Sequence, residues 1–204
     1  MDERRCAAVI DPLPFMTYAF VMSITPGPNN VMLTASGARF GLRRTLPHIV
    51  GICAGVAIQL LAVCAGLGAL FNRWPALQLA LGWAGAAYLV LLGWQILRSG
   101  ELQAREGARP VSFLSATMFQ FLNPKAWVMT VTAAAVFLPR EFGPVARSAY
   151  MVGITEAIGI PCIVIWTLFG SSLQNLLATA RNRRVFNICM ALALAATALA
   201  MVAT

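Results

Sequence analysis

Runs of apolar residues, each about 20 residues long, follow one another along the chain and are separated by short polar segments. About 20 apolar residues in a helix span the roughly 30 Å hydrocarbon core of a bilayer. The runs do not alternate apolar and polar positions, as the strands of a membrane β-barrel would. The pattern therefore predicts an all-α membrane protein whose six transmembrane helices lie at about 13–36, 46–70, 75–97, 113–138, 146–169 and 185–202.

Proline interrupts the first and fourth of these helices near their middle. The first contains Thr25-Pro26-Gly27-Pro28-Asn29-Asn30, and the fourth contains Gln120-Phe121-Leu122-Asn123-Pro124-Lys125. Because an unsatisfied backbone group costs several kcal/mol in hydrocarbon, irregular backbone survives there only against protein or a polar cavity. We therefore expect each break to border a binding site, with plain kinks in two long helices as the alternative.

Each break falls in the first helix of a three-helix half. We divide the chain into an N-terminal tail (1–14), a first three-helix repeat (15–97), a cytoplasmic loop (98–112) and a second three-helix repeat (113–204). Because three is odd, the second half must cross the membrane in the opposite sense. Broken helices at matching positions of two inverted repeats are the sequence pattern of secondary transporters whose site lies near the bilayer midplane.

The residues around the breaks indicate what such a site would bind. Thr25 before Pro26 and Asn123 before Pro124 each fit an N-cap followed by the first helical position. Free N–H groups at these half-helix starts would bind a carboxylate, and carbonyls freed upstream, such as those of Met22 and Gln120, would accept from an ammonium group. An amino acid is the simplest ligand with both groups. The expected substrate-binding residues are Thr25, Pro26, Gly27, Pro28, Asn29, Asn30, Gln120, Asn123, Pro124 and Lys125.

Two ionisable residues lie at comparable depth within the predicted helices. Lys125 is the only lysine of the chain, and Glu156 lies about ten residues into the fifth helix. A charge within the membrane costs at least about 2.5–3.5 kcal/mol and usually has a partner or a wet cavity. We expect both to line the cavity, as a pair that couples transport to protons. The alternatives are an interfacial position for Glu156 and a topological role for Lys125.

Other polar residues give weaker signals. Three of them are secondary candidates for lining the cavity, namely Gln59, Tyr88 and Thr155. The alternative for each is an inter-helix hydrogen bond. His48, the only histidine, is expected at the surface. The five cysteines are odd in number and lack metal-ligand spacing. Because no Ser-His-Asp set or phosphate loop is present either, we expect no enzyme activity, no cofactor and no metal site.

Composition and charge agree with this class. Apolar residues make up 59% of the chain, charged residues 11%, and the mean hydropathy is +0.76. The net charge of +8 comes from arginines between apolar runs, so it indicates topology in the bilayer rather than nucleic-acid binding. Nine arginines follow the odd-numbered helices: Arg39, Arg43, Arg44, Arg98, Arg105, Arg109, Arg181, Arg183 and Arg184. Five lie on the other side: Arg4, Arg5, Arg73, Arg140 and Arg147. The positive-inside rule therefore places both termini on the outer, periplasmic side.

Several motifs resemble those of the LysE/RhtB family of bacterial amino-acid exporters. The family's amino-terminal signature resembles the segment 25–30 followed by the arginine-rich stretch 37–44. Its glycine spacing in the second helix is similar to that of Gly51, Gly55 and Gly66. Its third- and fourth-helix motifs are similar to the segments 83–89 and 121–126. Segment 83–89 and Gln120-Phe121 are most similar to the branch that exports cysteine and O-acetylserine. The resemblance implies export of a small, neutral amino acid or derivative across the bacterial inner membrane by alternating access, driven by protons in antiport.

Two positions depart from the family pattern. Many members carry an acidic residue where this chain has Val56, and Glu156 has no recognised counterpart. A basic substrate such as lysine is therefore less expected. An exporter of ions or metals of related architecture and a non-transporting sensor or assembly subunit remain as alternatives. The sequence argues against the first because it has few intramembrane carboxylates and no thiolate or imidazole cluster, and the second would require both breaks to be plain kinks. A homo-oligomer is compatible with the sequence.

Overall fold

The computed structural model describes residues 11–67, 73–98, 109–139 and 141–202, and this part of the chain is helical throughout, without a strand. Its seven α-helices are α1 (Leu13–Ile24), α2 (Pro28–Ala62), α4 (Pro75–Arg98), α5 (Phe113–Leu122), α6 (Pro124–Phe137), α7 (Pro144–Ser172) and α8 (Ala180–Val202). A π-helical turn, η1 (Val63–Leu67), and a 3-10 turn, η2 (Leu176–Ala178), follow α2 and α7. Most of the predicted N-terminal tail and of the predicted loop 98–112 lies outside the described residues.

Both proline breaks interrupt helices, as the sequence predicts. α1 ends at Ile24 and α2 begins at Pro28, whereas α5 ends at Leu122 and α6 begins at Pro124. Proline loses no hydrogen bond at the first helical position, because an N–H there has no intrahelical partner. α1 and α5 are consequently short, with 12 and 10 residues.

The chain reverses direction within α2, at Gly41. Gly41 has φ 75° and ψ 171°, a left-handed conformation that favours glycine. The hydroxyls of Ser36 and Thr45 lie 2.9 Å apart across this turn, although nine residues of unbroken helix would separate them by about 13 Å. α2 is therefore two helical segments that fold back on each other, and the turn lies in the stretch predicted as the first loop. Pro47, expected in the first turn of a new helix, lies in the interior of α2.

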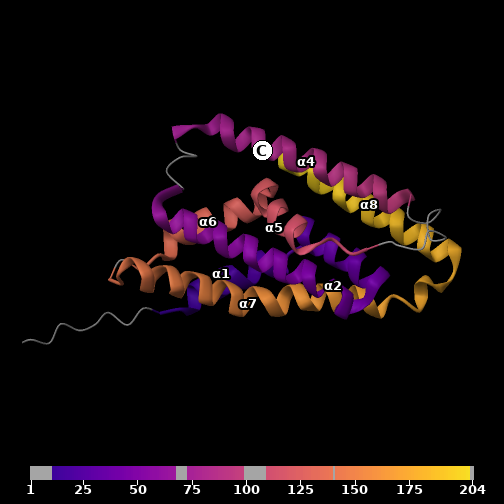
Figure 1. Ribbon diagram of the computed structural model, residues 1–204, viewed down its shortest axis with the longest axis horizontal. Coiled ribbons are helices and arrows are strands. Elements are labelled where there is room, and N and C mark those ends of the chain that lie inside the picture. Colours follow the sequence, from indigo (N-terminus) through magenta and orange to yellow (C-terminus); the bar gives the residue numbers. More distant parts are fainter. Residues whose placement is uncertain (1–10, 68–72, 99–108, 140, 203–204) are drawn as a thin grey trace, which may run out of the picture.

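The helices form two sides with a short pair between them. Figure 1 shows α4 and α8 side by side along one edge, α1, α2 and α7 along the other, and α5 and α6 between these groups. Glycine allows close approach where α2 crosses α5: a Cβ on Gly51 would meet the Phe113 carbonyl, and one on Gly55 would meet the Gln120 side chain. Gly51 and Gly55, spaced as GxxxG, thus serve close helix packing.

Much of the outer surface is apolar. Within the described residues, four helical stretches are long and apolar enough to cross a membrane, namely Pro28–Leu67, Leu79–Arg98, Pro144–Ser172 and Ala180–Ala200, and α1 and α5 are shorter apolar helices. Large side chains such as Trp83, Leu91 and Leu199 are more than half exposed on this surface. Such a surface suits contact with lipid rather than water.

The structure corrects the prediction for His48. Its side chain is fully buried, and neither ring nitrogen has a hydrogen-bond partner in the described part of the chain. The prediction is wrong because the second segment of α2 starts near the Gly41 turn rather than at Pro47, which carries His48 away from the surface into the helix contacts.

Candidate functional site

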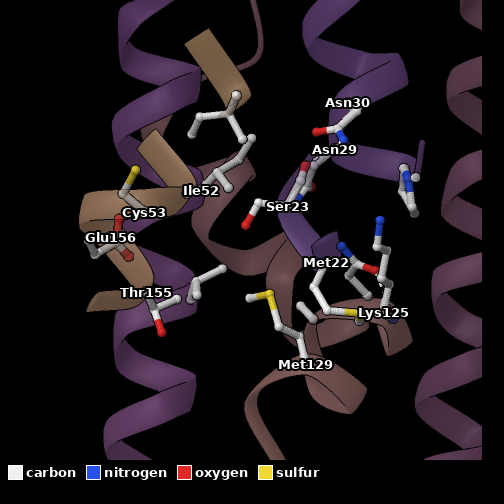
Figure 2. Close-up of a pocket in the computed structure, with 17 residues that line it drawn as sticks. Met22, Ser23, Asn29, Asn30, Ile52, Cys53, Lys125, Met129, Thr155 and Glu156 are labelled. Carbon is white, nitrogen blue, oxygen red and sulfur yellow. Dashed lines mark hydrogen bonds between the residues drawn. The ribbon is translucent and has the colours of Figure 1, made fainter. Parts of the chain in front are cut away.

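A cavity of about 570 Å³, which includes the space where it opens, lies where the two breaks meet. Figure 2 shows its lining side chains. Eight predicted residues line it: Gly27, Pro28, Asn29, Asn30, Asn123, Lys125, Thr155 and Glu156. Six other predicted residues are not among the lining residues: Thr25, Pro26, Gln59, Tyr88, Gln120 and Pro124.

Side chains of later helices satisfy the carbonyl groups that the first break frees. The Asn30 Nδ2 group donates to the carbonyls of Ser23 and Thr25, at 2.9 and 2.8 Å. The indole Nε1–H of Trp166, on α7, donates to the Ile24 carbonyl at 3.1 Å. Asn30 is 4% exposed, so its amide binds this backbone in a buried position. The end of α1 is therefore held by hydrogen bonds from α2 and α7.

The second break is satisfied in a similar way. The Asn123 side chain caps α6 by accepting from the Lys125 N–H at 3.1 Å, as predicted. On the upstream side, the Gln59 Nε2 group on α2 donates to the Gln120 carbonyl at 2.8 Å, and the Trp127 indole donates to the Phe121 carbonyl at 2.9 Å. Gln59 thus does not line the cavity and makes an inter-helix hydrogen bond, which was the alternative considered for it.

Hydrogen bonds connect the two breaks directly. The Asn29 and Gln120 side-chain amides pair reciprocally, with Nδ2–Oε1 and Nε2–Oδ1 distances of 2.9 and 3.1 Å. In the opposite direction, the Lys125 Nζ group donates to the carbonyl and the hydroxyl of Thr25, at 2.8 and 3.0 Å, and to the Pro26 carbonyl at 3.4 Å. Asn29 and Lys125 are each the second residue of their half-helix, so corresponding positions cross-connect the two motifs.

The helix start predicted at the first break is wrong by two residues. α2 begins at Pro28 with Gly27 as the N-cap, and Thr25 is instead the residue that ends α1. A residue that precedes proline is driven to extended backbone, so Gly27 before Pro28 cannot start the helix. Gly27 has φ −169°, which any residue adopts. A Cβ here would lie 2.8 Å from Cδ of Lys125, so the glycine leaves room for that side chain.

Only one half-helix keeps unpaired donors of the kind expected. In the described part of the chain, the backbone N–H groups of Asn29 and Asn30 have no hydrogen-bond partner. At α6, by contrast, the N–H groups of Lys125 and Ala126 both donate to Asn123. The expected carbonyl acceptor at Gln120 is also occupied, because it accepts from Gln59 and from the Asn123 N–H. The polar groups around the cavity are thus less symmetric than predicted.

Lys125 and Glu156 face the cavity from opposite sides (Figure 2). They form no ion pair with each other, because the Lys125 ammonium group is bonded to Thr25 and Pro26. The Oε1 atom of Glu156 is buried and has no hydrogen-bond partner among the described residues, and the Cys53 thiol lies beside the same carboxylate. Each charge therefore faces the cavity without an opposite charge beside it.

The remaining walls combine small polar groups with apolar side chains. Met22, whose carbonyl the sequence analysis proposed as an acceptor, is a lining residue, and eight others were not predicted: Ser23, Ile52, Cys53, Val56, Ala126, Met129, Gly159 and Ile163. Their types resemble ordinary membrane-helix residues, so only the three-dimensional contacts single them out. Val56, the position at which the chain departs from the family pattern, shares this cavity with Glu156. The arrangement suits a small ligand with two opposite charges and an apolar side chain.

An aromatic layer closes the cavity on the side of α1 and the C-terminal end of α6. Beyond Met129 and Thr155 lies a gap with no room for a water molecule, which Phe15 and Tyr18 help to line. The Tyr18 hydroxyl donates to the Met129 carbonyl at 3.3 Å, and the rings of Phe15 and Phe137 stack with centroids 5.3 Å apart. This side of the site is therefore dry and closed.

Tyr88 packs its ring against Phe119, with centroids 5.0 Å apart, away from the cavity. Among the described residues, no three His, Cys, Asp or Glu side chains come close enough together to hold a metal ion.

Apolar spanning helices and a cavity between two proline breaks define the class: a multi-pass membrane protein with the architecture of a transporter. Residues 20–204 match the family model of the LysE type translocators, and the chain belongs to this family. The family expected from the sequence motifs is thus confirmed, and its members are transporters rather than enzymes.

Curated relatives cover most of the chain. A cysteine/O-acetylserine efflux protein of Klebsiella pneumoniae subsp. pneumoniae is 34% identical over 167 residues, which are 79% of this chain and 83% of the relative. Proteins of the same name from Escherichia coli K12 and Shigella sonnei are each 35% identical over 185 residues, 88% of this chain and 91% of the relative. No solved structure matches this chain.

Proposed function

We propose that this protein exports a small, neutral amino acid or a close derivative from the cytoplasm, by alternating access and in exchange for protons. The observation that carries the proposal is the cavity in which the two breaks meet, with Lys125 on one side and Glu156 on the other. Cysteine and O-acetylserine are the substrates we propose first, because the similar efflux proteins are named for them. Both are small zwitterions.

The charges suggest how the substrate lies. Its ammonium group binds Glu156, whose Oε1 atom has no protein partner among the described residues. Its carboxylate binds towards Lys125 and the N-terminus of α2, where the N–H groups of Asn29 and Asn30 are unpaired in the described structure. The side chain of the substrate faces Ile52, Val56 and other apolar lining residues. A substrate with a second positive charge would find no second carboxylate among the lining residues.

The fold is consistent with six spans. α1 and the first segment of α2 together form one broken span, and α5 and α6 form another. At 1.5 Å per residue, α1 and α5 are about 18 and 15 Å long, which is roughly half of a 30 Å hydrocarbon core. The breaks then lie near the midplane, where a transporter of this type binds its substrate.

Corresponding contacts support two inverted repeats. α1 packs on α7, and its counterpart α5 packs on α2. A side chain of α7, Trp166, donates to a carbonyl at the end of α1, while a side chain of α2, Gln59, donates to one at the end of α5. α4 and α8, the third helix of each half, pack against each other. We propose that the protein lies in the bacterial inner membrane, and the arginine count supports an orientation with both termini outside.

Proton exchange is assigned to Glu156. It is the only carboxylate among the lining residues, so the substrate ammonium group and a proton would compete for it. Release of substrate to the outside would let a proton bind, and the protonated side chain would return across the cycle without substrate. The structure offers no comparable donor cluster to the alternative of metal export.

Export of labelled cysteine and O-acetylserine from cells tests this proposal. Glu156→Gln keeps the size of the side chain and removes its charge, so we expect at least about a tenfold loss of export and loss of its dependence on external pH. Glu141→Gln removes an exposed charge outside the cavity and serves as the matched control. Protein amounts in the membrane are compared by immunoblot.

Competing analogues test the orientation of the substrate. Cysteamine retains the ammonium group and 3-mercaptopropionate retains the carboxylate, so Glu156→Gln should weaken inhibition by the first and spare inhibition by the second. Unchanged export in Glu156→Gln, with Glu141→Gln also active, would contradict the assignment of Glu156. Absence of export of any small amino acid by the wild type would contradict the proposed function itself.

A further inference from the structure

A second cavity, separate from the first, lies between α2, α4, η2 and α8. It measures about 790 Å³ with its open part, and none of its lining residues lines the cavity at the breaks. Two arginines line it, Arg39 from α2 and Arg183 from α8. Among the described residues, no acidic side chain lines this cavity, so within this part of the chain the two positive charges have no carboxylate beside them.

The structure holds one of these arginines in place and leaves the other available. The Nη1 group of Arg183 donates to the carbonyls of Ala178 and Leu177, at 2.9 and 3.4 Å, which fixes the guanidinium group at the end of η2. Its Nη2 and Nε donors, like all those of Arg39, have no hydrogen-bond partner in the described part of the chain. A guanidinium group presents its donors in a planar fork that matches the oxygens of a phosphate.

Apart from the side-chain amides of Gln174 and Asn187, the rest of the wall is apolar. Ala35, Ile96, Leu177 and Phe186 line the same cavity as the two arginines. Close to it in the chain, Trp94, Leu97 and Val185 expose 53%, 42% and 55% of their surface, on helices that are apolar enough to span a membrane. The cavity thus combines positive charge with an apolar wall beside a lipid-facing surface. A soluble phosphate would gain nothing from that wall, whereas a phospholipid would use both parts.

We propose that this cavity binds the phosphate headgroup of an anionic membrane phospholipid, with its acyl chains against α4 and α8. Pockets of this kind, basic and set between membrane helices at their cytoplasmic ends, bind anionic lipid headgroups. The occupant would bridge the first segment of α2 to α8. Because these elements come from different halves of the chain, the bound lipid would stabilise their contact.

Native mass spectrometry of the purified full-length protein tests the proposal, with phosphatidylglycerol and phosphatidylcholine as probes. We expect the wild type to retain phosphatidylglycerol in preference to phosphatidylcholine, and Arg39→Gln/Arg183→Gln to lower the affinity for phosphatidylglycerol at least about tenfold. The matched control is Arg43→Gln/Arg184→Gln, which removes two charges from the same helices but outside the cavity lining. We expect this control to bind phosphatidylglycerol like the wild type.

Arg183 also holds η2, so its loss could disturb folding. Arg39→Gln alone avoids this difficulty, because the Arg39 side chain makes no hydrogen bond to the described protein, and it should lower the affinity by itself. Equal loss of binding in the control pair would overturn the proposal in favour of a diffuse basic surface. Displacement of phosphatidylglycerol by inorganic phosphate, without any lipid preference, would overturn the lipid as occupant. Unchanged binding in both Arg39 variants would overturn the site.

Discussion

The polar side chains next to the breaks mostly bind backbone. Asn30 holds two carbonyls of the first break, Asn123 caps α6, and Gln59 holds the Gln120 carbonyl. In a bilayer this use has a clear physical reason, because no water can take the place of these partners. Substitution of Asn30 or Asn123 would therefore destabilise the fold as well as alter the cavity. Glu156 and Lys125 are the more informative residues for tests of ligand binding.

A double-mutant cycle at Asn29 and Gln120 tests the bond between the two breaks. Removal of either partner leaves a buried amide unsatisfied, so we expect Asn29→Ala or Gln120→Ala to cost about 1–3 kcal/mol of stability. The double variant should cost less than the sum of the single variants, since it leaves no orphaned amide between them. Thermal unfolding in detergent measures the stability of the purified wild type, the two single variants and the double variant. Additive losses would show that the pair is not coupled.

Gly27→Ala tests the space that Lys125 occupies. A Cβ at this position would lie 2.8 Å from Cδ and 3.0 Å from Nζ of Lys125, so the ammonium group must leave Thr25 and Pro26. We expect export to fall at least about tenfold, with a stability loss of about 1–3 kcal/mol typical of overpacking. Gly153→Ala is the control, because a Cβ there meets nothing within 4 Å. Wild-type export by Gly27→Ala would show that this position of Lys125 is dispensable.

At the scale of the helices, the sequence predicted much of the fold. The apolar runs located α4 and α7 closely, and Asn123-Pro124 located the start of α6, because the second break contains a single proline preceded by an N-cap residue. At the first break, two prolines two residues apart offered two possible starts, and the restriction on Gly27 decided between them. The turn at Gly41 lies in the stretch predicted as the first loop, but only a glycine among arginines indicated where in that stretch the chain turns. The partners Trp166 and Cys53 came from tertiary packing, which one sequence does not reveal.

The close crossing of α2 and α7 can be tested by adding a Cβ at the two glycines where their backbones approach, Gly37 and Gly170. A Cβ on Gly37 would overlap the Thr167 carbonyl oxygen, and one on Gly170 would overlap the Thr34 carbonyl oxygen. Both obstacles are backbone atoms, so the two helices would have to move apart. We expect Gly37→Ala and Gly170→Ala each to lower stability by at least about 2 kcal/mol, measured by thermal unfolding. Equal midpoints for these variants and Gly153→Ala would contradict the close crossing.

At the scale of the whole molecule, we propose that the arginine-rich end sets the direction of the protein in the membrane. Arg39, Arg98 and Arg183 belong to α2, α4 and α8, and the second cavity brings parts of these three helices together. The positive-inside rule holds such an end in the cytoplasm. With the six spans proposed above, both termini would then lie on the outer side.

Reporter fusions measure this orientation. Alkaline phosphatase fused after Thr204 should be active, because that end is expected in the periplasm, and a fusion after Arg98 should be inactive. A green fluorescent protein at the same two positions should give the opposite pattern. An inactive phosphatase after Thr204 would overturn either the number of spans or the orientation.

The cross-connected breaks also have a consequence for how the chain is made. The ribosome delivers α1 and α2 to the membrane before α6 and α7 exist, so the carbonyls of Ile24 and Pro26 must wait for Trp166 and Lys125. Until then they need water or the insertion machinery as partners. The nascent N-terminal half therefore lacks some of its backbone hydrogen-bond partners, and α1 would reach its final position in the bilayer only after the second half is inserted.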